Sequence, residues 1–201
     1  NMQGKALIGS FHDEAMQNFP GYHFATAGKG RTRASQGDLE TAAKFLLDAQ
    51  NRVPSPDTII LLGDVYLRQG NEEMAQRQYS LADAGEQKLG DLHDAHRLAL
   101  RWADHDINLD EALDIAQKDY AEGKDIYAAD TYAWCLYKKG RFSEAKTLIE
   151  EAMRLKTGDA KILFHAGMIE KALGNKKAAV KMLGLALSLN PAFDLIQAPV
   201  A

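Results

Sequence analysis

Three histidines and an aspartate near the middle of the chain have the chemistry to bind a metal ion. His93 and His96 are three residues apart, so on a helix they lie one turn apart, and Asp104 and His105 follow. Imidazole and carboxylate groups in such an arrangement can share a cation such as zinc. The pattern does not specify a third ligand, and histidine is common on helix surfaces. We therefore predict no metal site, and keep a small-ligand or metal-binding role at this place as an alternative.

The other reactive side chains form no recognisable catalytic set. The sequence contains no GxxxxGK[ST], GxSxG, HExxH or CxxC motif and no EF-hand loop. Its single cysteine, Cys135, follows Trp134 within a helical pattern and is expected to be a buried, inert thiol. No nucleophile, base and orienting group occur together. We predict that the protein is not an enzyme and uses no cofactor.

Two arginines have the spacing to bind one carboxylate together. Arg97 and Arg101 are four residues apart, so both guanidinium groups would project from one side of a helix. Asp94 and Asp104 fall on the same side and offer them a partner within the chain. A solvated, self-neutralised helix face is therefore the alternative to a ligand site.

A helix beginning near residue 126 would carry an aromatic face. Four side chains recur at i, i+3, i+7 and i+10, which places them on one side: Tyr127, Asp130, Trp134 and Tyr137. One explanation is a surface that accepts an apolar or aromatic segment of a ligand. The other is packing between neighbouring helix pairs, which we favour for Trp134 itself.

Composition and charge limit the partners. The 201 residues are 46% apolar and 26% charged, with a net charge of −4 and one cysteine. A weakly acidic chain offers no basic field to nucleic acid, and no run of about 18 apolar residues is present to span a bilayer. We predict neither nucleic-acid binding nor membrane insertion by this segment, and one cysteine excludes an internal disulfide.

The elements that position these residues follow from a repeat of 34 residues in the range 125–191. When the sequence is shifted by that length, small residues coincide: Gly140 with Gly174, Ala145 with Ala179, Ala152 with Ala186, and Ala133 with Gly167. Small residues let two helices approach closely, and the glycine between them ends one helix before the next begins. A self-match of this length is typical of helix–turn–helix units stacked into a solenoid.

The runs Ala133–Ala145 and Ala166–Pro191 resemble tetratricopeptide repeats (TPRs). The resemblance implies an all-α fold, a right-handed α-solenoid of antiparallel helix pairs. Segments such as Leu98–His105 and Asn190–Phe193 are also similar to the C-terminal part of long bacterial multi-TPR proteins of unassigned function. That group often carries an export signal, so the resemblance favours an exported or periplasmic location, with a cytoplasmic one as the alternative.

The repeat landmarks divide the chain into seven parts. We predict the second helix of a truncated repeat in 1–20, repeats in 21–55, 56–90, 91–124, 125–158 and 159–191, and a C-terminal cap in 192–201. The second repeat has an extended second helix. The third is irregular, because Ala75 and Ala112 are 37 residues apart and residues 104–108 replace the usual turn glycine. That irregularity either marks a binding site or is neutral drift.

Several helix ends can also be predicted. Asn108 and Glu111 have the spacing of a capping box before a helix starting near Leu109, and Asp159 is suited to cap a helix from Ala160. The stretch 193–199 could begin a further helix. The first helix would expose an apolar face, which implies more chain upstream or a homodimer contact; its candidates are Leu7, Ile8, Phe11 and Met16.

In the family that the sequence resembles, the first helix of each repeat lines a concave groove. Carried over by position, the candidate partner-binding residues are Asp64, Arg68, Asp94, Arg97, Arg101, Asp104, His105, Tyr127, Asp130, Trp134, Tyr137, Lys138, Phe164, Met168 and Lys171. The same geometry also offers Phe24, Arg31, Ser35, Asp57 and Lys161 to the groove. They do not match the carboxylate clamp of chaperone-binding TPRs. We predict a scaffold that binds a protein segment, as peptide or helix, in this groove; a purely structural segment of a longer solenoid is the other alternative.

Overall fold

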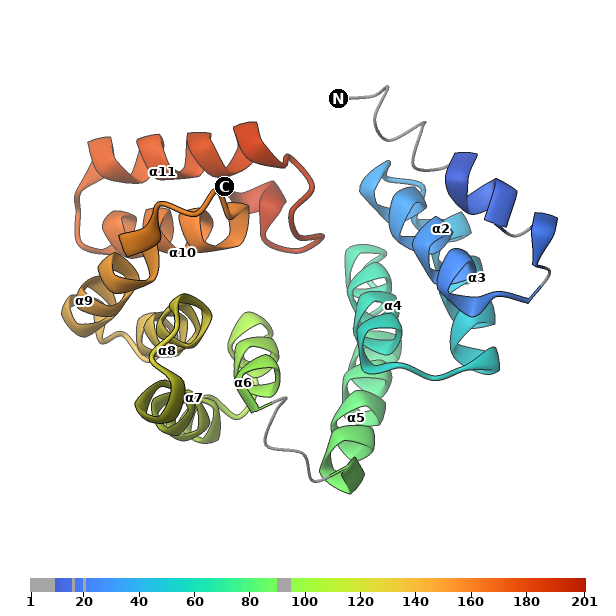
Figure 1. Cartoon of the computed structure of the whole chain (residues 1–201), viewed down its shortest axis with the longest axis horizontal. Helices are drawn as coiled ribbons and strands as arrows, with labels where there is room; N and C mark the ends of the chain where they lie inside the picture. Colours follow the sequence, from blue (N-terminus) through green and yellow to red (C-terminus); the bar gives the residue numbers. More distant parts are fainter. Residues whose placement is uncertain (1–9, 16, 20, 90–94) are drawn as a thin grey trace. The chain divides into compact units, whose positions relative to one another are not determined.

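The computed structural model describes residues 10–15, 17–19, 21–89 and 95–201. The chain divides into two compact units, Asn1–Gly90 (unit 1) and Asp91–Ala201 (unit 2). The described residues form helices and turns and contain no strand (Figure 1). The predicted all-α solenoid class, built from antiparallel helix pairs, is therefore confirmed.

Unit 1 consists of helix pairs. Residues 10–15 and 17–18 are helical, and they precede α2 (His23–Ser35), α3 (Leu39–Arg52), α4 (Pro56–Arg68) and α5 (Glu72–Leu89). Helix α2 pairs with α3, α4 pairs with α5, and α3 packs on α4. Of the predicted exposed apolar face, Phe11 is 58% exposed. Leu7, Ile8 and Met16 lie outside the described residues.

Unit 2 continues the pattern with α6 (Ala95–Asp104), α7 (Leu109–Gly123), α8 (Ile126–Lys138), α9 (Phe142–Ala152), α10 (Ala160–Ala172) and α11 (Lys176–Leu189). Short 3₁₀ turns follow at η2 (Met153–Leu155) and η3 (Ala198–Val200). The pairs are α6–α7, α8–α9 and α10–α11, and each stacks on the next through α7–α8 and α9–α10. The small residues predicted at helix contacts, Ala133, Ala145, Ala152, Gly167 and Ala186, are buried.

Side-chain caps set the starts of the helices in unit 2 that carry the candidate residues. Asp159 accepts from the backbone N–H groups of Lys161 (2.8 Å) and Ile162 (3.2 Å), which confirms the predicted cap of α10. Asp125 caps α8 in the same way. Helix α7 begins at Leu109 as predicted, but the capping box is wrong. Asn108 has a left-handed backbone (φ 43°) and its side chain makes no cap, because that conformation does not place it over the first turn.

Turn and contact glycines confirm two further expectations. Gly140 (φ 75°) and Gly174 (φ 80°) end helices in the left-handed conformation that glycine adopts at little cost. In the irregular repeat, Asp106 (φ 55°) adopts this conformation instead. A Cβ atom on Gly167 would lie 2.7 Å from Cγ of Leu183, so α10 and α11 approach too closely for a side chain there.

The stretch that follows α11 does not form the further α-helix that the sequence allowed. Residues 191–197 are turns and bends, and the 3₁₀ helix η3 closes the sequence. Asp194 accepts from the N–H groups of Ile196 (2.8 Å) and Gln197 (2.9 Å), which holds a tight turn in place of helical hydrogen bonds. We name residues 193–201 the return segment, because they fold back onto unit 2.

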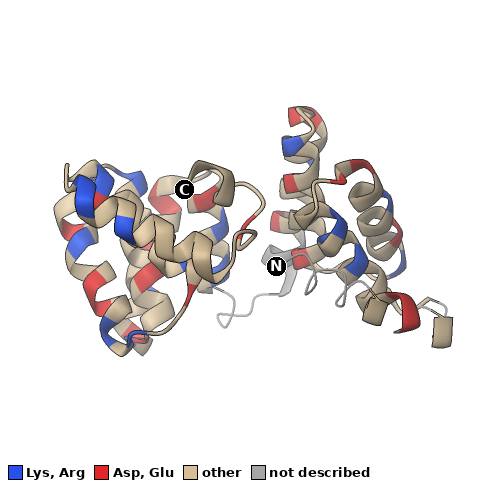
Figure 2. Ribbon diagram, turned by 90° about the horizontal axis from the view of Figure 1, so that it is seen from above, with Lys and Arg blue, Asp and Glu red and all other residues tan. Residues whose placement is uncertain are grey.

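Charged residues of both signs occur in each unit (Figure 2). Among the helices that the structure describes, none is long and apolar enough to span a membrane.

Candidate functional site

The first helices of the three pairs in unit 2 form one continuous face. Helix α6 packs beside α8, and α8 packs beside α10. We name the side formed by these three helices the first-helix face. Most of the candidate residues predicted from the sequence belong to these helices, and the return segment packs here as well.

Trp134 of α8 lies at the centre of the first-helix face and is 2% exposed. Its ring stacks on Tyr137, with 4.7 Å between centroids, and on His165 of α10, with 4.2 Å. The indole Nε1 donates to Oδ1 of Asp104 at 2.9 Å. Trp134 therefore joins α6, α8 and α10, which is the packing between adjacent pairs that we favoured for it.

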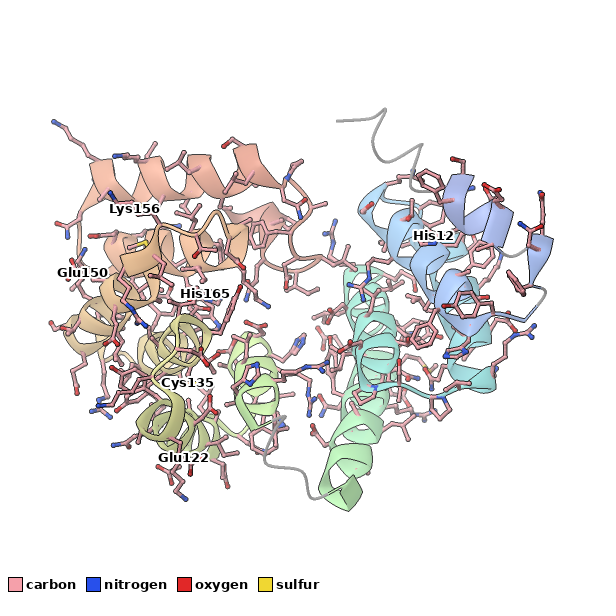
Figure 3. The ribbon with its side chains drawn as sticks, in the orientation of Figure 1. His12, Glu122, Cys135, Glu150, Lys156 and His165 are labelled. Carbon is pink, nitrogen blue, oxygen red and sulfur yellow. The ribbon has the colours of Figure 1, made fainter. Side chains whose placement is uncertain are left out.

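A second polar contact joins α8 to α10, between Asp130 and His165. Oδ1 and Oδ2 of Asp130 lie 2.9 and 3.0 Å from Nδ1 of His165, and both side chains are buried. Nε2 of His165 is buried and has no hydrogen-bond partner. His165 and Cys135 both lie within unit 2 (Figure 3). Sequence reasoning missed His165; its signal was a histidine four residues after Lys161, on the same side of a helix as a predicted groove residue.

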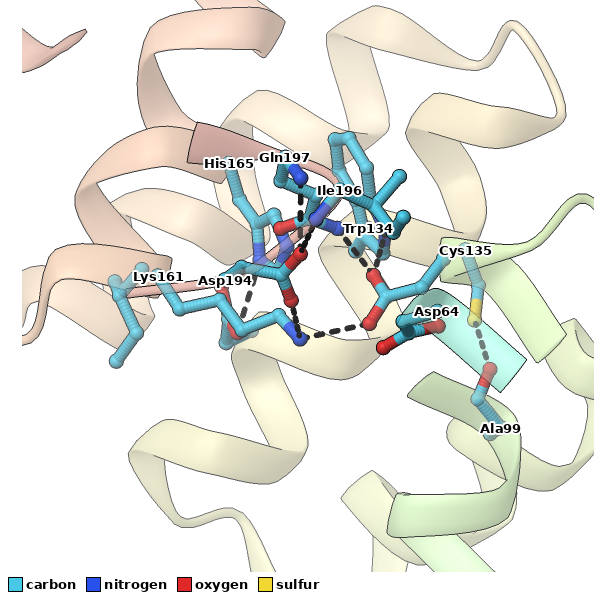
Figure 4. A network of polar contacts seen from close by, with 12 residues as sticks. Asp64, Ala99, Trp134, Cys135, Lys161, His165, Asp194, Ile196 and Gln197 are labelled. Carbon is cyan, nitrogen blue, oxygen red and sulfur yellow. Dashed lines mark hydrogen bonds and ion pairs between the residues drawn. The ribbon is translucent and has the colours of Figure 1, made fainter. Parts of the chain in front are cut away.

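Lys161 is the cationic centre of the face (Figure 4). Its Nζ lies 2.7 Å from Oδ2 of Asp104 and 3.3 Å from Oδ2 of Asp194 in the return segment. Burial lowers the pKa of Lys161, but the two carboxylates outweigh burial and raise this pKa above its usual value. For Asp194, burial raises the pKa, while Lys161 and the N–H groups of Gln197 and Ile196 outweigh it and lower the pKa. Both shifts favour the charged forms of Lys161 and Asp194 at neutral pH.

Gln197 and Phe193 complete the contact between the return segment and the face. Nε2 of Gln197 donates to Oδ1 of Asp104, the same oxygen that accepts from Trp134. The ring of Phe193 packs on Phe164 of α10, with 5.4 Å between centroids. Gln197 is 5% exposed and Phe164 is 1% exposed. The sequence had no signal for these pairings, since Asp104 and Gln197 are 93 residues apart.

The remaining predicted residues of unit 2 differ in accessibility. Tyr127 is 50% exposed, and Arg97 and Lys171 are exposed, whereas Arg101 is 6% exposed. The two arginines are thus unequal in accessibility. Met168 is half-buried. Lys138 lies over the Trp134 ring, 5.2 Å from its centroid, and pairs with Asp106 at 2.8 Å.

In unit 1, Asp64 of α4 accepts from the hydroxyl of Tyr79 at 2.9 Å, within the α4–α5 pair, and Arg68 is exposed. Asp94 and His93 lie outside the described residues. Burial lowers the pKa of His105. In the described part of the chain, no group of three or more His, Cys, Asp or Glu side chains is placed to hold a metal ion.

The sequence of α10 and α11 matches a known family. Residues 160–193 match the family model described as the tetratricopeptide repeat. No curated protein matches this chain in sequence.

Several solved structures are similar to the chain. PilW, described as a "widely conserved type IV pilus biogenesis factor", superposes with a TM-score of 0.57 at 16% identity, over 99% of this chain and 92% of that one. The Cut9-Hcn1 hetero-tetramer of the APC/C gives 0.61 at 15% identity, over 99% of this chain and 39% of that one. Yeast Tom70 gives 0.56 at 16% identity, over 96% and 41%. At these identities the likeness establishes the fold. The chain spans about two fifths of the latter two proteins.

Proposed function

We propose that this chain, a stack of helix pairs of which residues 160–193 match the tetratricopeptide repeat, is a non-enzymatic scaffold that binds an extended segment of a protein partner on the first-helix face of unit 2. The observation that carries the proposal is the return segment. An irregular stretch of chain lies on this face and reaches it through an aromatic contact, an ion pair and an amide hydrogen bond. A face that binds an extended peptide must offer side chains that contact a segment without helical structure, and these three contacts are of that kind.

The face combines the groups that recognition of a peptide needs. Phe164 supplies an aromatic surface, Lys161 a cation for an acidic side chain, and Asp104 an acceptor for an amide. Exposed side chains on the same three helices, Arg97, Tyr127 and Lys171, would contact the parts of a partner that extend beyond this centre. Buried aromatic anchors with a polar rim are typical of protein interfaces.

The solved structures that the chain resembles are consistent with this role. One is described as a biogenesis factor and another as part of a hetero-tetramer. Binding of another protein chain, as in the hetero-tetramer, is the role that we propose by analogy; fold analogy alone does not identify the partner. The narrower resemblance to long bacterial multi-TPR proteins, and with it the exported location, stays a prediction.

The test is affinity capture from the native organism with three forms of the chain. The first is the wild type. The second is Arg97→Glu/Lys171→Glu, which reverses two exposed charges on α6 and α10. The third is Lys176→Glu/Lys177→Glu, which reverses two exposed charges on α11, outside the first-helix face. Trp134→Ala is unsuitable, because removing a side chain that is 2% exposed would disturb the fold itself.

We expect a partner that quantitative mass spectrometry finds with the wild type and the α11 variant and that is depleted with the face variant. Circular dichroism must show that all three forms are equally folded. A partner lost equally from both variants would place binding elsewhere or make it a general charge effect. No specific partner in any form would favour a purely structural segment.

A further inference from the structure

The return segment contacts the first-helix face as a ligand would. Phe193 packs on Phe164, Asp194 pairs with Lys161, and Gln197 donates to Asp104. These three contacts come from residues spaced 0, 1 and 4 along the segment, and they reach both α6 and α10. Ala198 is also buried. A short linear pattern in the segment therefore matches side chains drawn from two repeats.

The segment carries its own conformation. Asp194 uses Oδ1 to accept from the N–H groups of Ile196 and Gln197, and uses Oδ2 to pair with Lys161. One side chain thus fixes the turn and makes the contact with the face. A peptide that holds its own turn loses less conformational freedom on binding, so the same pattern in another chain would bind in the same way.

The contact is also imperfect, which suits an occupant that is replaced. Nζ of Lys161 pairs with Asp104 as well as with Asp194, so Asp194 shares this cation with a second carboxylate. Oε1 of Gln197 is buried without a hydrogen-bond partner. This unpaired buried acceptor weakens the contact made by the return segment, so a partner segment that leaves no such group unpaired would bind the face more tightly.

We infer that the return segment is an internal ligand of the first-helix face, and that the partner's segment displaces it by presenting the same pattern: an aromatic residue, an aspartate directly after it, two further residues and a glutamine. This inference rests on the proposed function and specifies its ligand and its regulation. The covalent link gives the internal segment an effective concentration of about 1 mM, so a partner segment competes only when its own contacts are stronger or the internal ones are weakened.

The experiment measures binding of a labelled peptide of residues 190–201 to the full chain by fluorescence anisotropy. The test variant is Gln197→Glu, which changes one polar group, removes the donor to Asp104 and places two carboxylates together. The matched control is Val200→Glu, which adds the same charge at a residue of the segment that is 60% exposed. We expect the peptide to bind Gln197→Glu at least about tenfold more tightly than the wild type or the control, because the internal competitor is weakened.

Three variant peptides establish specificity. A peptide carrying Gln197→Glu or Asp194→Asn should lose most of its binding to the Gln197→Glu chain, whereas one carrying Val200→Glu should keep it. Intrinsic tryptophan emission provides a second readout, since Trp134 shares Asp104 with Gln197. Equal binding of the peptide to wild type and Gln197→Glu, or binding to neither, would overturn the inference. If Gln197→Glu proved unfolded by circular dichroism, Phe193→Ala would take its place.

The peptide experiment and the affinity capture test the internal ligand and the scaffold function separately. If the peptide binds as expected but affinity capture with the Gln197→Glu chain yields no partner, the internal ligand stands and the scaffold function fails. If a partner is captured equally by wild type and Gln197→Glu, the scaffold function stands, and displacement of the return segment is refuted.

Discussion

At the scale of single residues, unit 2 buries polar groups among the apolar side chains of its helix pairs. Asp130, His165 and Gln197 are each at most 5% exposed. Buried polar groups require partners, and most of those seen here reach across helix pairs instead of staying within one. Such contacts specify how successive pairs align, because a shifted alignment would leave the groups unpaired.

Cys135 should be unreactive in the folded protein. Its Sγ lies 3.7 Å from the carbonyl oxygen of Ala112, its side chain is 0% exposed, and burial raises the pKa of the thiol to about 12. At pH 8 the folded thiol is thus protonated and shielded. We expect labelling by a maleimide or Ellman's reagent to be at least about a hundredfold slower in buffer than in denaturant.

The same shift predicts the direction of a pH effect on stability. The pKa of the thiol in the folded protein lies above its value in the unfolded chain, which is about 8.5. Below pH 8.5 the thiol is protonated in both states and has no effect on the free energy of unfolding. As pH rises above 8.5 the unfolded chain loses this proton first, so stability falls until the pH reaches the folded pKa. Urea unfolding of Cys135→Ala beside the wild type checks this. A wild-type thiol that reacts quickly while circular dichroism shows an intact fold would refute the burial argument.

Docking of the return segment should depend on the charge of Asp194. Its pKa is lowered in the docked state, so the stabilisation is present above the free-state pKa, about 3.9, and is lost as pH falls through the lower docked value. We expect docking, followed by tryptophan emission, to be constant from about pH 5 to 8 and to fall below about pH 4. Lys161, Asp104 and His105 also lie in this charged cluster.

Asp194→Asn is the control for this titration. The amide keeps an oxygen for the turn but cannot titrate, whereas His105 and Asp104 remain. The acid step should therefore shrink in the variant. An identical step in both proteins would assign it to one of the other groups.

At the scale of the elements, close approach between paired helices is set by glycine and alanine. Gly167 and Gly184 allow a matched comparison, because they face different surroundings within the α10–α11 pair. A Cβ atom on Gly167 would lie 2.7 Å from Leu183, whereas one on Gly184 meets nothing within 4 Å.

The substitution to alanine should therefore have opposite signs at the two positions. We expect Gly167→Ala to lower the free energy of unfolding by roughly 1–3 kcal/mol through overpacking. Gly184→Ala should raise it by about 0.5–1 kcal/mol, because alanine loses less backbone entropy in a helix. Urea denaturation measures both. Equal effects at the two sites would contradict the packing of α10 against α11 described here.

At the scale of the whole chain, the division into two compact units predicts local responses to mutation. In a repeat protein each helix pair contacts its neighbours, so stability is close to a sum of local terms. Ala145 is 0% exposed and Ala179 is 4% exposed, and both belong to unit 2. We expect Ala145→Leu and Ala179→Leu each to cost roughly 1–3 kcal/mol by overpacking a helix contact.

Hydrogen exchange followed by mass spectrometry separates the units. Protection should fall in peptides from α8 to α11, and α3 and α4 of unit 1 should be unchanged. Ala172→Leu, at an exposed position at the end of α10, is the control and should leave both units unaffected. A uniform loss of protection over the whole chain would mean that the two units unfold together.

The sequence by itself determined the repeat. A period of 34 residues, the turn glycines and the small residues at helix contacts are local or regularly spaced features, and they depend on backbone conformation and side-chain volume. The helix ends at Gly140 and Gly174 and the cap at Asp159 could therefore be predicted from residue type and place within the repeat. The absence of a turn glycine around Asp106 could be predicted in the same way, because the repeat shows where that glycine should stand.

Only the tertiary structure decided which polar groups meet. Asp104 accepts from Trp134 and Gln197, which follow it by 30 and 93 residues, and Lys161 joins Asp104 to Asp194. No local rule relates such positions, because the distance between them depends on how three helix pairs stack. The sequence allowed residues 193–199 to begin a further helix. The turn that forms instead, and its place on the first-helix face, follow from long-range contacts that outweigh weak local helix preference.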